Sequence, residues 1–310
     1  MTSVLGSILP VFAIILAGWG ARRMNVLGEN AGRELNRFVV WLALPALLFR
    51  ILAGARVADI WQPDFIACFA AGMMTVFVLT VAISAWVTRS LADAAIDGLN
   101  AAYPNNAYIG FPLCLAVIGP SALEPVAISS IMTACLLFSL GLIVIEIGLQ
   151  SERHPLRLLG NVAKALSRNP LVVAPAAGAL FLAFGIPLPK PADAFLTMLG
   201  GAASPCALVA LGLFLAEGHE NAPSLGKPAA LVALKLVAQP ALTWAAAVWV
   251  LGTPPAVTRI AVLIAALPTG TGPFMIAEFY RREAGVTSRT ILISTIVSIA
   301  TITLYLSVSA

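Results

Sequence analysis

The strongest constraint on this chain is a polar, proline-containing interruption within a hydrophobic run, at residues 100–112 (N-A-A-Y-P-N-N-A-Y-I-G-F-P). Pro104 and Pro112 each lack a backbone N–H, and each clashes with the carbonyl four residues earlier, so a regular helix cannot continue through both. A second interruption, residues 266–274 (A-L-P-T-G-T-G-P-F), lies at the corresponding place in the other half of the chain. The sequence therefore predicts two broken helices.

Composition places these breaks inside a membrane. The chain is 60% hydrophobic and 10% charged, with a mean hydropathy of +0.96, whereas soluble domains carry roughly 25% charged residues. Within lipid, a break is tolerated only where protein or a polar cavity covers it. The net charge of +4 forms no basic patch interleaved with aromatic residues, so nucleic acid is not an expected partner. We expect an integral protein of the inner (plasma) membrane, surrounded by the lipid bilayer, and the compact loops favour a bacterial source.

The predicted fold is an all-α polytopic membrane protein with ten transmembrane helices, because ten segments contain the roughly 20 apolar residues that cross a bilayer. The fourth and ninth are the broken ones. Arg22 and Arg23 follow the first apolar run instead of preceding it, so we interpret that run as a retained span and not as a cleaved signal peptide. The predicted spans are 3–20, 35–54, 64–88, 98–118, 125–149, 168–186, 193–216, 228–251, 257–280 and 286–308.

Basic residues set the predicted orientation, since cytoplasmic loops of membrane proteins are enriched in lysine and arginine. With the amino terminus outside, inner loops receive thirteen of the 18 lysines and arginines, outer loops receive four, and Lys235 lies within a span. We therefore predict that both termini are outside. The basic linker 151–168 separates a first five-helix repeat, 1–150, from a second, 169–310. An odd number of spans in each half makes the two repeats inverted relative to each other.

The breaks carry the candidate substrate site. Helices that restart near Pro112 and Pro273 run in opposite directions, so their amino ends face the same midplane. Each amino end carries about half a positive charge and free N–H groups, which favours an anion such as a carboxylate. The opposing carboxyl ends could instead coordinate a cation. The candidate substrate-binding residues here are Asn105, Asn106, Tyr108, Gly110, Pro112, Pro268, Thr269, Gly270, Thr271 and Pro273, with the Thr271 hydroxyl as a candidate helix cap.

Lys235 is a charged residue near mid-depth, roughly 12 Å into its span at 1.5 Å per residue. Such a residue is costly in lipid and is a functional-site hypothesis by default. It could attract a substrate carboxylate or titrate during transport; alternatively it snorkels to the inner interface or pairs with Glu146 or Glu278. Gln239, one helical turn further on, is a candidate for the same cavity.

The sequence contains no constellation typical of an enzyme. His154 and His219 lie in predicted loops, and no span carries a paired-carboxylate site or a serine with a histidine base. The four cysteines show no C-x-x-C spacing and are interpreted as small apolar residues. We therefore expect no metal site, no cofactor and no catalytic activity.

Two motifs resemble the auxin efflux carrier family, which contains plant auxin exporters and many bacterial carriers. They are N-x-x-x-P-N-N-x-Y-I-G-F-P-L at residues 100–113 and A-x-P-x-x-x-x-P-F-x-x-A-x-x-Y at residues 266–280. The resemblance implies two inverted five-helix repeats, as in bile-acid/sodium symporters, with broken helices four and nine crossing in a mobile domain. It also implies a scaffold formed by spans one, two, six and seven. The span 64–88 lacks the mid-depth acid of plant relatives, which favours a small carboxylate over auxin.

The expected function is that of a secondary transporter. It would move an organic anion, either a small malonate-like carboxylate or an auxin-like acid, by alternating access around the midplane crossover. The alternative is a sodium- or proton-coupled symporter of larger amphipathic acids, similar to bile-acid symporters. A coupling proton or sodium ion, and a homodimer through the scaffold, are the remaining expected partners.

Overall fold

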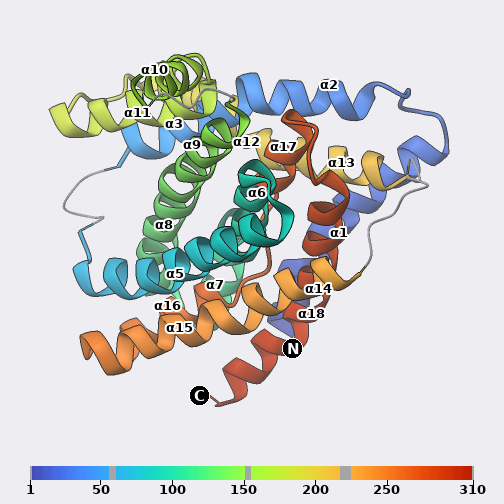
Figure 1. The fold of residues 1–310 in the computed structure, drawn as a ribbon. Helices are drawn as coiled ribbons and strands as arrows, with labels where there is room; N and C mark the ends of the chain where they lie inside the picture. The colour runs from blue at the N-terminus through green and yellow to red at the C-terminus, as the bar shows by residue number, and fades with distance from the viewer. Residues whose placement is uncertain (1, 56–60, 151–154, 217–224, 309–310) are drawn as a thin grey trace.

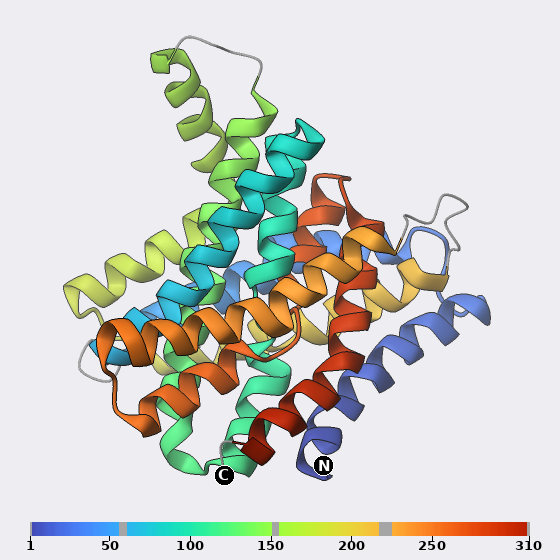
Figure 2. The same cartoon turned by 60° about the horizontal axis from the view of Figure 1, so that its bottom comes forward.

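The computed structural model describes residues 2–55, 61–150, 155–216 and 225–308, and every regular element within these ranges is a helix (Figure 1). His154 and His219 lie outside the described residues. The predicted linker 151–168 contains a helix of its own, α10 (Pro155–Leu166). The amino end of α1 and the carboxyl end of α18 lie on the same side of the molecule in both views (Figures 1 and 2).

In the first half of the chain, short π-helical or 3-10 turns (η) interrupt several of the helices. The elements are α1 (Thr2–Arg23), α2 (Ala31–Phe38), η1 (Val39–Ala43), α3 (Leu44–Ala53), α5 (Pro63–Thr88), α6 (Leu91–Ala102), η2 (Asn106–Gly110), α7 (Phe111–Val117), η3 (Pro120–Ala122), α8 (Leu123–Ile131), η4 (Met132–Leu137) and α9 (Phe138–Leu149).

The second half, after α10, repeats this pattern of long helices and one broken segment. Its elements are α11 (Pro170–Phe184), α12 (Lys190–Gly201), α13 (Ala203–Ala216), α14 (Gly226–Ala233), η5 (Leu234–Ala238), α15 (Gln239–Ala245), η6 (Ala246–Leu251), α16 (Pro255–Ala265), α17 (Gly272–Phe279) and α18 (Ala284–Val308).

Helices occupy all ten segments that the sequence analysis proposed as spans. Within the described residues, six continuous helices are long and apolar enough to cross a membrane, and α10 with α11, bent by 79°, adds a seventh candidate. Neither broken segment qualifies, because each of its halves is shorter than a span. The count of ten and the orientation of the termini therefore remain predictions. Large apolar side chains on the outside, such as Trp86 at 84% and Met198 at 80% exposure, suit contact with lipid.

Two groups of helices pack closely. In one, α1 and α2 lie against α13, while α3 lies against α11 and α12. Gly18 and Gly212 permit the α1–α13 contact, since a Cβ atom at Gly212 would lie 2.1 Å from the Ile15 carbonyl oxygen. Small residues at such crossings let two backbones approach, which is how helices associate within lipid. In the other group, α5 packs against α6 and α15, α6 against α9, and α14 against α18.

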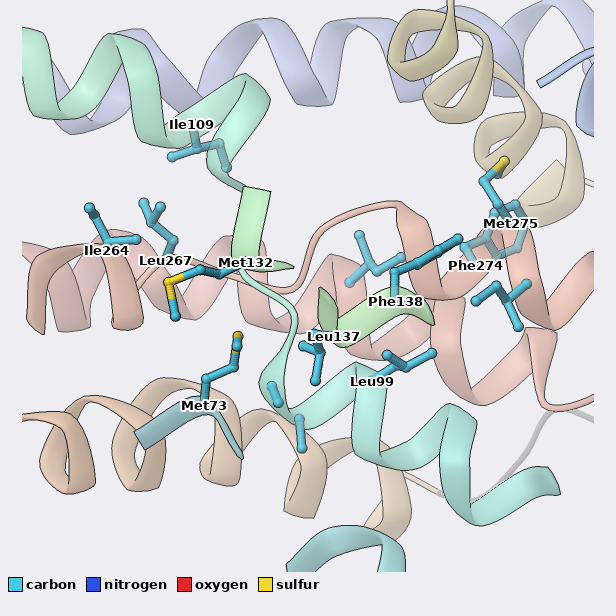
Figure 3. Close-up of a cluster of buried hydrophobic side chains, with 14 of the residues drawn as sticks. Met73, Leu99, Ile109, Met132, Leu137, Phe138, Ile264, Leu267, Phe274 and Met275 are labelled. Atoms are coloured by element: carbon cyan, nitrogen blue, oxygen red, sulfur yellow. The ribbon is translucent and has the colours of Figure 1, made fainter. Parts of the chain in front are cut away.

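The core surrounds the two interruptions. Figure 3 shows buried apolar side chains from α5, α6, η4, α9, α16 and α17 gathered around the extended segments that join α6 to η2 and α16 to α17. Leu99, Leu267 and Phe274 among them are no more than 1% exposed. This apolar packing removes water from the breaks, so their polar backbone groups must find partners inside the protein.

Candidate functional site

The two extended segments cross and pair with each other. Pro104 and Thr269 form an antiparallel β-bridge. The Asn105 N–H donates to the Pro268 carbonyl at 2.8 Å, and the Gly270 N–H donates to the Tyr103 carbonyl at 3.0 Å. Proline and the extended backbone deprive these residues of helical partners, so each segment satisfies the backbone groups of the other. The predicted crossing of the two breaks is therefore present.

The first broken helix restarts earlier than predicted: η2 begins at Asn106 and runs directly into α7, so Pro112 lies within a helical run and not at its start. The second restarts as predicted, with Pro273 in the first turn of α17. Proline fits there because the first N–H groups of a helix have no partner within it. The predicted hydroxyl cap at Thr271 is wrong. Thr271 precedes α17 but has helical dihedral angles (φ −80°, ψ −16°) and makes no capping hydrogen bond, whereas a capping side chain normally requires an extended backbone at that position.

A cavity of about 1170 Å³ lies against this crossing. One wall comes from both breaks, and includes Tyr103 and Asn106 from the first and Thr271 and Gly272 from the second. Side chains of α3, α8, α11, α12, α13 and η4 form the other walls. Asn106 starts η2 and Gly272 starts α17, so the amino ends of both restarted helical segments border the same space. Their positive ends therefore act on one ligand volume.

The predicted site residues fall into two groups. Four of them line the cavity: Asn105, Asn106, Gly270 and Thr271. The others occupy the crossing or its surroundings without lining that space: Gly110, Pro112, Lys235, Gln239, Pro268, Thr269 and Pro273. Pro112 is exposed, and the Thr269 hydroxyl donates to the Asn100 carbonyl at 2.8 Å. Tyr108 lies within η2, and its side chain is outside the described part of the chain.

Asn106 is oriented by a residue that sequence reasoning missed. Its Nδ2 donates to the Thr133 hydroxyl at 3.3 Å, and Thr133 also lines the cavity. Asn106 Oδ1 is buried and has no hydrogen-bond partner in the described structure. Thr133 lies on η4 within an ordinary apolar run, so no motif distinguishes it in the sequence.

Charged side chains surround one end of the cavity. Arg50 Nε donates to Asp193 Oδ1 at 2.7 Å, and both residues line the cavity together with Lys190 and Glu124. This end is the one that the orientation analysis places outside. The sequence assigns Arg50 only to the outer side of the membrane. It is far from both breaks along the chain, so the sequence does not show that it lines the cavity.

Aromatic and hydrogen-bond contacts hold α17 against neighbouring helices. Phe274 packs edge-on against Phe214 of α13, with ring centroids 5.4 Å apart. The hydroxyl of Tyr280, at the carboxyl end of α17, donates to Glu146 Oε1 at 2.5 Å and accepts from Asn169 Nδ2 at 3.4 Å. These contacts join α17 to α9, α11 and α13.

Lys235 lies behind the crossing instead of in the cavity. Its side chain is fully buried, and Nζ donates to the Ala265 carbonyl at 2.7 Å. The predicted alternatives of snorkelling and of pairing with Glu146 or Glu278 are wrong: a snorkelling ammonium would be exposed, and the described residues give Lys235 no ion pair. Gln239 Nε2 donates to the Ala102 carbonyl at 3.2 Å.

A cluster of ion pairs lies at the end of the molecule that the sequence places in the cytoplasm. Arg282 Nε donates to Asp93 Oδ1 at 2.6 Å, and Lys227 lies within 3.0 Å of both Asp97 and Glu283. Burial by itself raises the pKa of Asp93, but hydrogen bonds from Arg282 and Ser90 outweigh it, so that pKa lies below its usual value. Among the described residues, no three histidine, cysteine, aspartate or glutamate side chains cluster as metal ligands.

Comparison with known proteins supports a transport role for this geometry. A family model described as "Membrane transport protein" matches residues 3–306. A protein of Rhizobium meliloti (strain 1021) named "Putative malonate transporter" is 34% identical over 308 residues, which cover 98% of this chain and 95% of that protein. YfdV of Escherichia coli (strain K12), an uncharacterized transporter, is 26% identical over 70% of each chain. Auxin efflux carrier component 8 of Arabidopsis thaliana is 22% identical over 97% of this chain and 96% of its own.

Proposed function

Because the chain belongs to the membrane transport protein family, we propose that this integral inner-membrane transporter is a secondary carrier of small organic anions, with a malonate-like dicarboxylate as its substrate class. The observation that carries the proposal is the meeting of two helix amino ends at one cavity, at Asn106 and at Gly272. Backbone N–H groups at helix amino ends are ready-made donors to carboxylate oxygens.

The side chains at the crossing support an anion over a cation. Where the two breaks border the cavity, they contribute amide, hydroxyl and phenol groups but no carboxylate. The two acids that line the cavity, Glu124 and Asp193, already accept hydrogen bonds from Gln62 and Arg50. A carboxylate would therefore meet donors from both halves of the chain. The name of the Rhizobium relative, at 34% identity, makes malonate the first compound to test.

We propose that transport occurs by alternating access, with the cavity open at one end and sealed at the other. The open end would lie beside Arg50 and Lys190, and α17 contacts such as Phe274–Phe214 would seal the other. Movement of the crossing relative to α3, α11, α12 and α13 would open the sealed end and close the other. We propose inverted repeats at 1–150 and 169–310 as the basis of this movement, because each contributes one broken helix.

The size of the cavity supports a second candidate, a symporter of larger amphipathic acids. Its volume of about 1170 Å³ exceeds the usual range of roughly 300–1,000 Å³ for small-molecule sites. Apolar side chains of α11, including Phe181 and Ile186 just beyond its end, line part of it. Such a wall suits the hydrocarbon body of a bile-acid-like molecule.

Transport in proteoliposomes separates these candidates. Purified protein is reconstituted, and uptake of labelled malonate, succinate, indole-3-acetate and taurocholate is measured with sodium or choline outside, with and without a pH gradient. We expect saturable malonate uptake that excess unlabelled malonate inhibits. Saturable taurocholate uptake without malonate uptake would favour the second candidate, and no saturable flux of any carboxylate would exclude both. Asn106→Ala is the test variant, and Gly201→Ala, where nothing lies within 4 Å of an added Cβ atom, is the matched control.

A further inference from the structure

Two side chains of one interrupted helix, α14–η5–α15, bond to the carboxyl ends of the two broken helices. Lys235 Nζ donates to the carbonyl of Ala265, the last residue of α16, at 2.7 Å. Gln239 Nε2 donates to the carbonyl of Ala102, the last residue of α6, at 3.2 Å. Since Lys235 and Gln239 are four residues apart, they lie on the same face of their helix. This face therefore meets both carboxyl ends at the crossing.

The carboxyl end of a helix carries about half a negative charge, and its last carbonyls have no partner within the helix. Two such ends meet at the crossing, where apolar packing excludes water. Their mutual repulsion is stronger in that low-dielectric surrounding than it would be in water. A positive charge between them would offset this repulsion and keep both breaks in register.

Lys235 is placed to supply that charge. It is completely buried, and its described partner is the Ala265 carbonyl. It does not line the cavity, so substrate contact does not account for it. The ion-pair cluster around Lys227 includes neither Lys235 nor Gln239. Burying a lysine away from lipid, water and carboxylates costs folding free energy, so such a residue is a functional-site hypothesis by default.

We propose that Lys235 is a positioning residue: its ammonium group is a built-in counter-charge for the carboxyl ends of α16 and α6, and it takes the place that a coupling metal cation would otherwise fill. By holding Ala265, it also sets the segment from Ala266 to Gly272 against Asn105 and the cavity. Transport by this protein is then independent of sodium. The transport part of this inference rests on the proposed anion-carrier function, whereas the structural part does not.

The first measurement uses the unmodified protein. Its melting temperature in detergent, without substrate, is compared in sodium, potassium and choline chloride at equal ionic strength. We expect no selective stabilisation by sodium, and equal malonate uptake in sodium and choline. Selective stabilisation by sodium, or sodium-dependent uptake, would overturn the proposal. This arm needs no variant and so cannot fail through misfolding.

The second measurement replaces the charge. Lys235→Met keeps the length of the side chain and removes the ammonium, and Lys164→Met, at an exposed position of α10, is the matched control. We expect Lys235→Met to lower malonate uptake by ~10-fold, the scale of a favourable charge at a partly buried helix end, and the control to leave it unchanged. Wild-type uptake by Lys235→Met would contradict the proposal.

Chemical rescue distinguishes a counter-charge from simple packing. Lys235→Ala leaves space into which propylammonium, but not choline, should fit. We expect propylammonium to raise the melting temperature of Lys235→Ala and to leave that of the wild type unchanged, whereas the isosteric neutral 1-propanol should have no effect. Equal rescue by 1-propanol would assign Lys235 a packing role only and overturn the proposal. If these melting results hold while no carboxylate is transported, the counter-charge stands and the proposed substrate class fails.

Discussion

Pro104 and Thr269 lie opposite each other in an antiparallel bridge that joins the two broken helices. Neither segment could satisfy its backbone alone inside an apolar core, so the breaks are stable only as a pair. The cavity wall is consequently shared by both halves of the chain. A change on either side of the bridge is expected to alter the same binding site.

The first prediction concerns the residue that orients Asn106. Thr133→Val keeps the shape of the side chain but removes the hydroxyl that accepts from Asn106 Nδ2. A hydrogen bond to a charged ligand is worth about 1.5–3 kcal/mol, so a misplaced amide should raise the KM for malonate by roughly tenfold. Ser130→Ala is the control, because Ser130 also lines the cavity but bonds to the Val126 carbonyl of its own helix. Equal KM values for the two variants would contradict this role of Thr133.

The second prediction concerns the close approach at the start of α17. A Cβ atom at Gly272 would lie 2.8 Å from Tyr103 Cζ, and Tyr103 is itself packed edge-on against Phe138. Gly272→Ala should therefore displace the crossing and lower the free energy of unfolding by about 1–3 kcal/mol, as overpacking does. Thermal unfolding and malonate uptake measure both effects. Gly201→Ala meets no atom within 4 Å and should match the wild type.

The third prediction concerns the sealed end of the cavity. Tyr280→Phe removes a hydroxyl that bonds to Glu146 and Asn169, which should destabilise the sealed state by about 1 kcal/mol or more. In a Cys206→Ser background, Met275→Cys in the cavity wall should then react faster with an impermeant thiol reagent added from the Tyr280 side.

Tyr305→Phe is the control for this measurement, since its hydroxyl donates to the Arg259 carbonyl at 3.0 Å on α16. It removes a comparable hydrogen bond away from the seal. We expect it to leave the labelling rate of Met275→Cys unchanged. An equal increase in both variants would indicate general loosening and not opening of the sealed end.

The fourth prediction is a pH dependence of stability at the Asp93–Arg282 ion pair. Hydrogen bonds from Arg282 and Ser90 hold the folded-state pKa of Asp93 below its usual value. Its contribution to stability is therefore present above about pH 4 and is lost as the pH falls through the lower folded value. The melting temperatures of wild type and Asp93→Asn should differ at neutral pH and converge as the pH falls through the lowered folded pKa of Asp93. A difference that does not shrink with falling pH before the protein unfolds would contradict the assignment.

The fifth prediction tests orientation. Ser167, within the basic linker 151–168, and Ser121, between α7 and α8, lie in connections that the charge pattern places on opposite sides. With an impermeant thiol reagent, Ser167→Cys should label only from the cytoplasm, and Ser121→Cys only from outside. Labelling of both from one side would exclude the predicted topology of ten spans.

The positions of the breaks could be read from the sequence, because they follow from local chemistry. Pro104 and Pro268 lie in the two interruptions and lack the N–H that a helix requires, and Pro273 is suited to restart α17. The apolar composition determined, equally directly, that such breaks must lie inside a protein core. Asn105 and Thr271 could therefore be proposed for the site before any helix was placed in space.

Tertiary structure alone decided which groups meet. Lys235 was recognised as unusual, but whether it faces a ligand, lipid or an acid depended on the rotation of its helix, and packing directed it to Ala265. Thr133 and Arg50 reached the cavity from segments that carry no motif. Hydropathy and proline act on neighbours along the chain, so the sequence by itself determined the breaks and their burial. The partner of a side chain depends on how its helix is rotated and how deeply it is buried. Only the fold therefore decided which residues line the cavity and which hold the crossing.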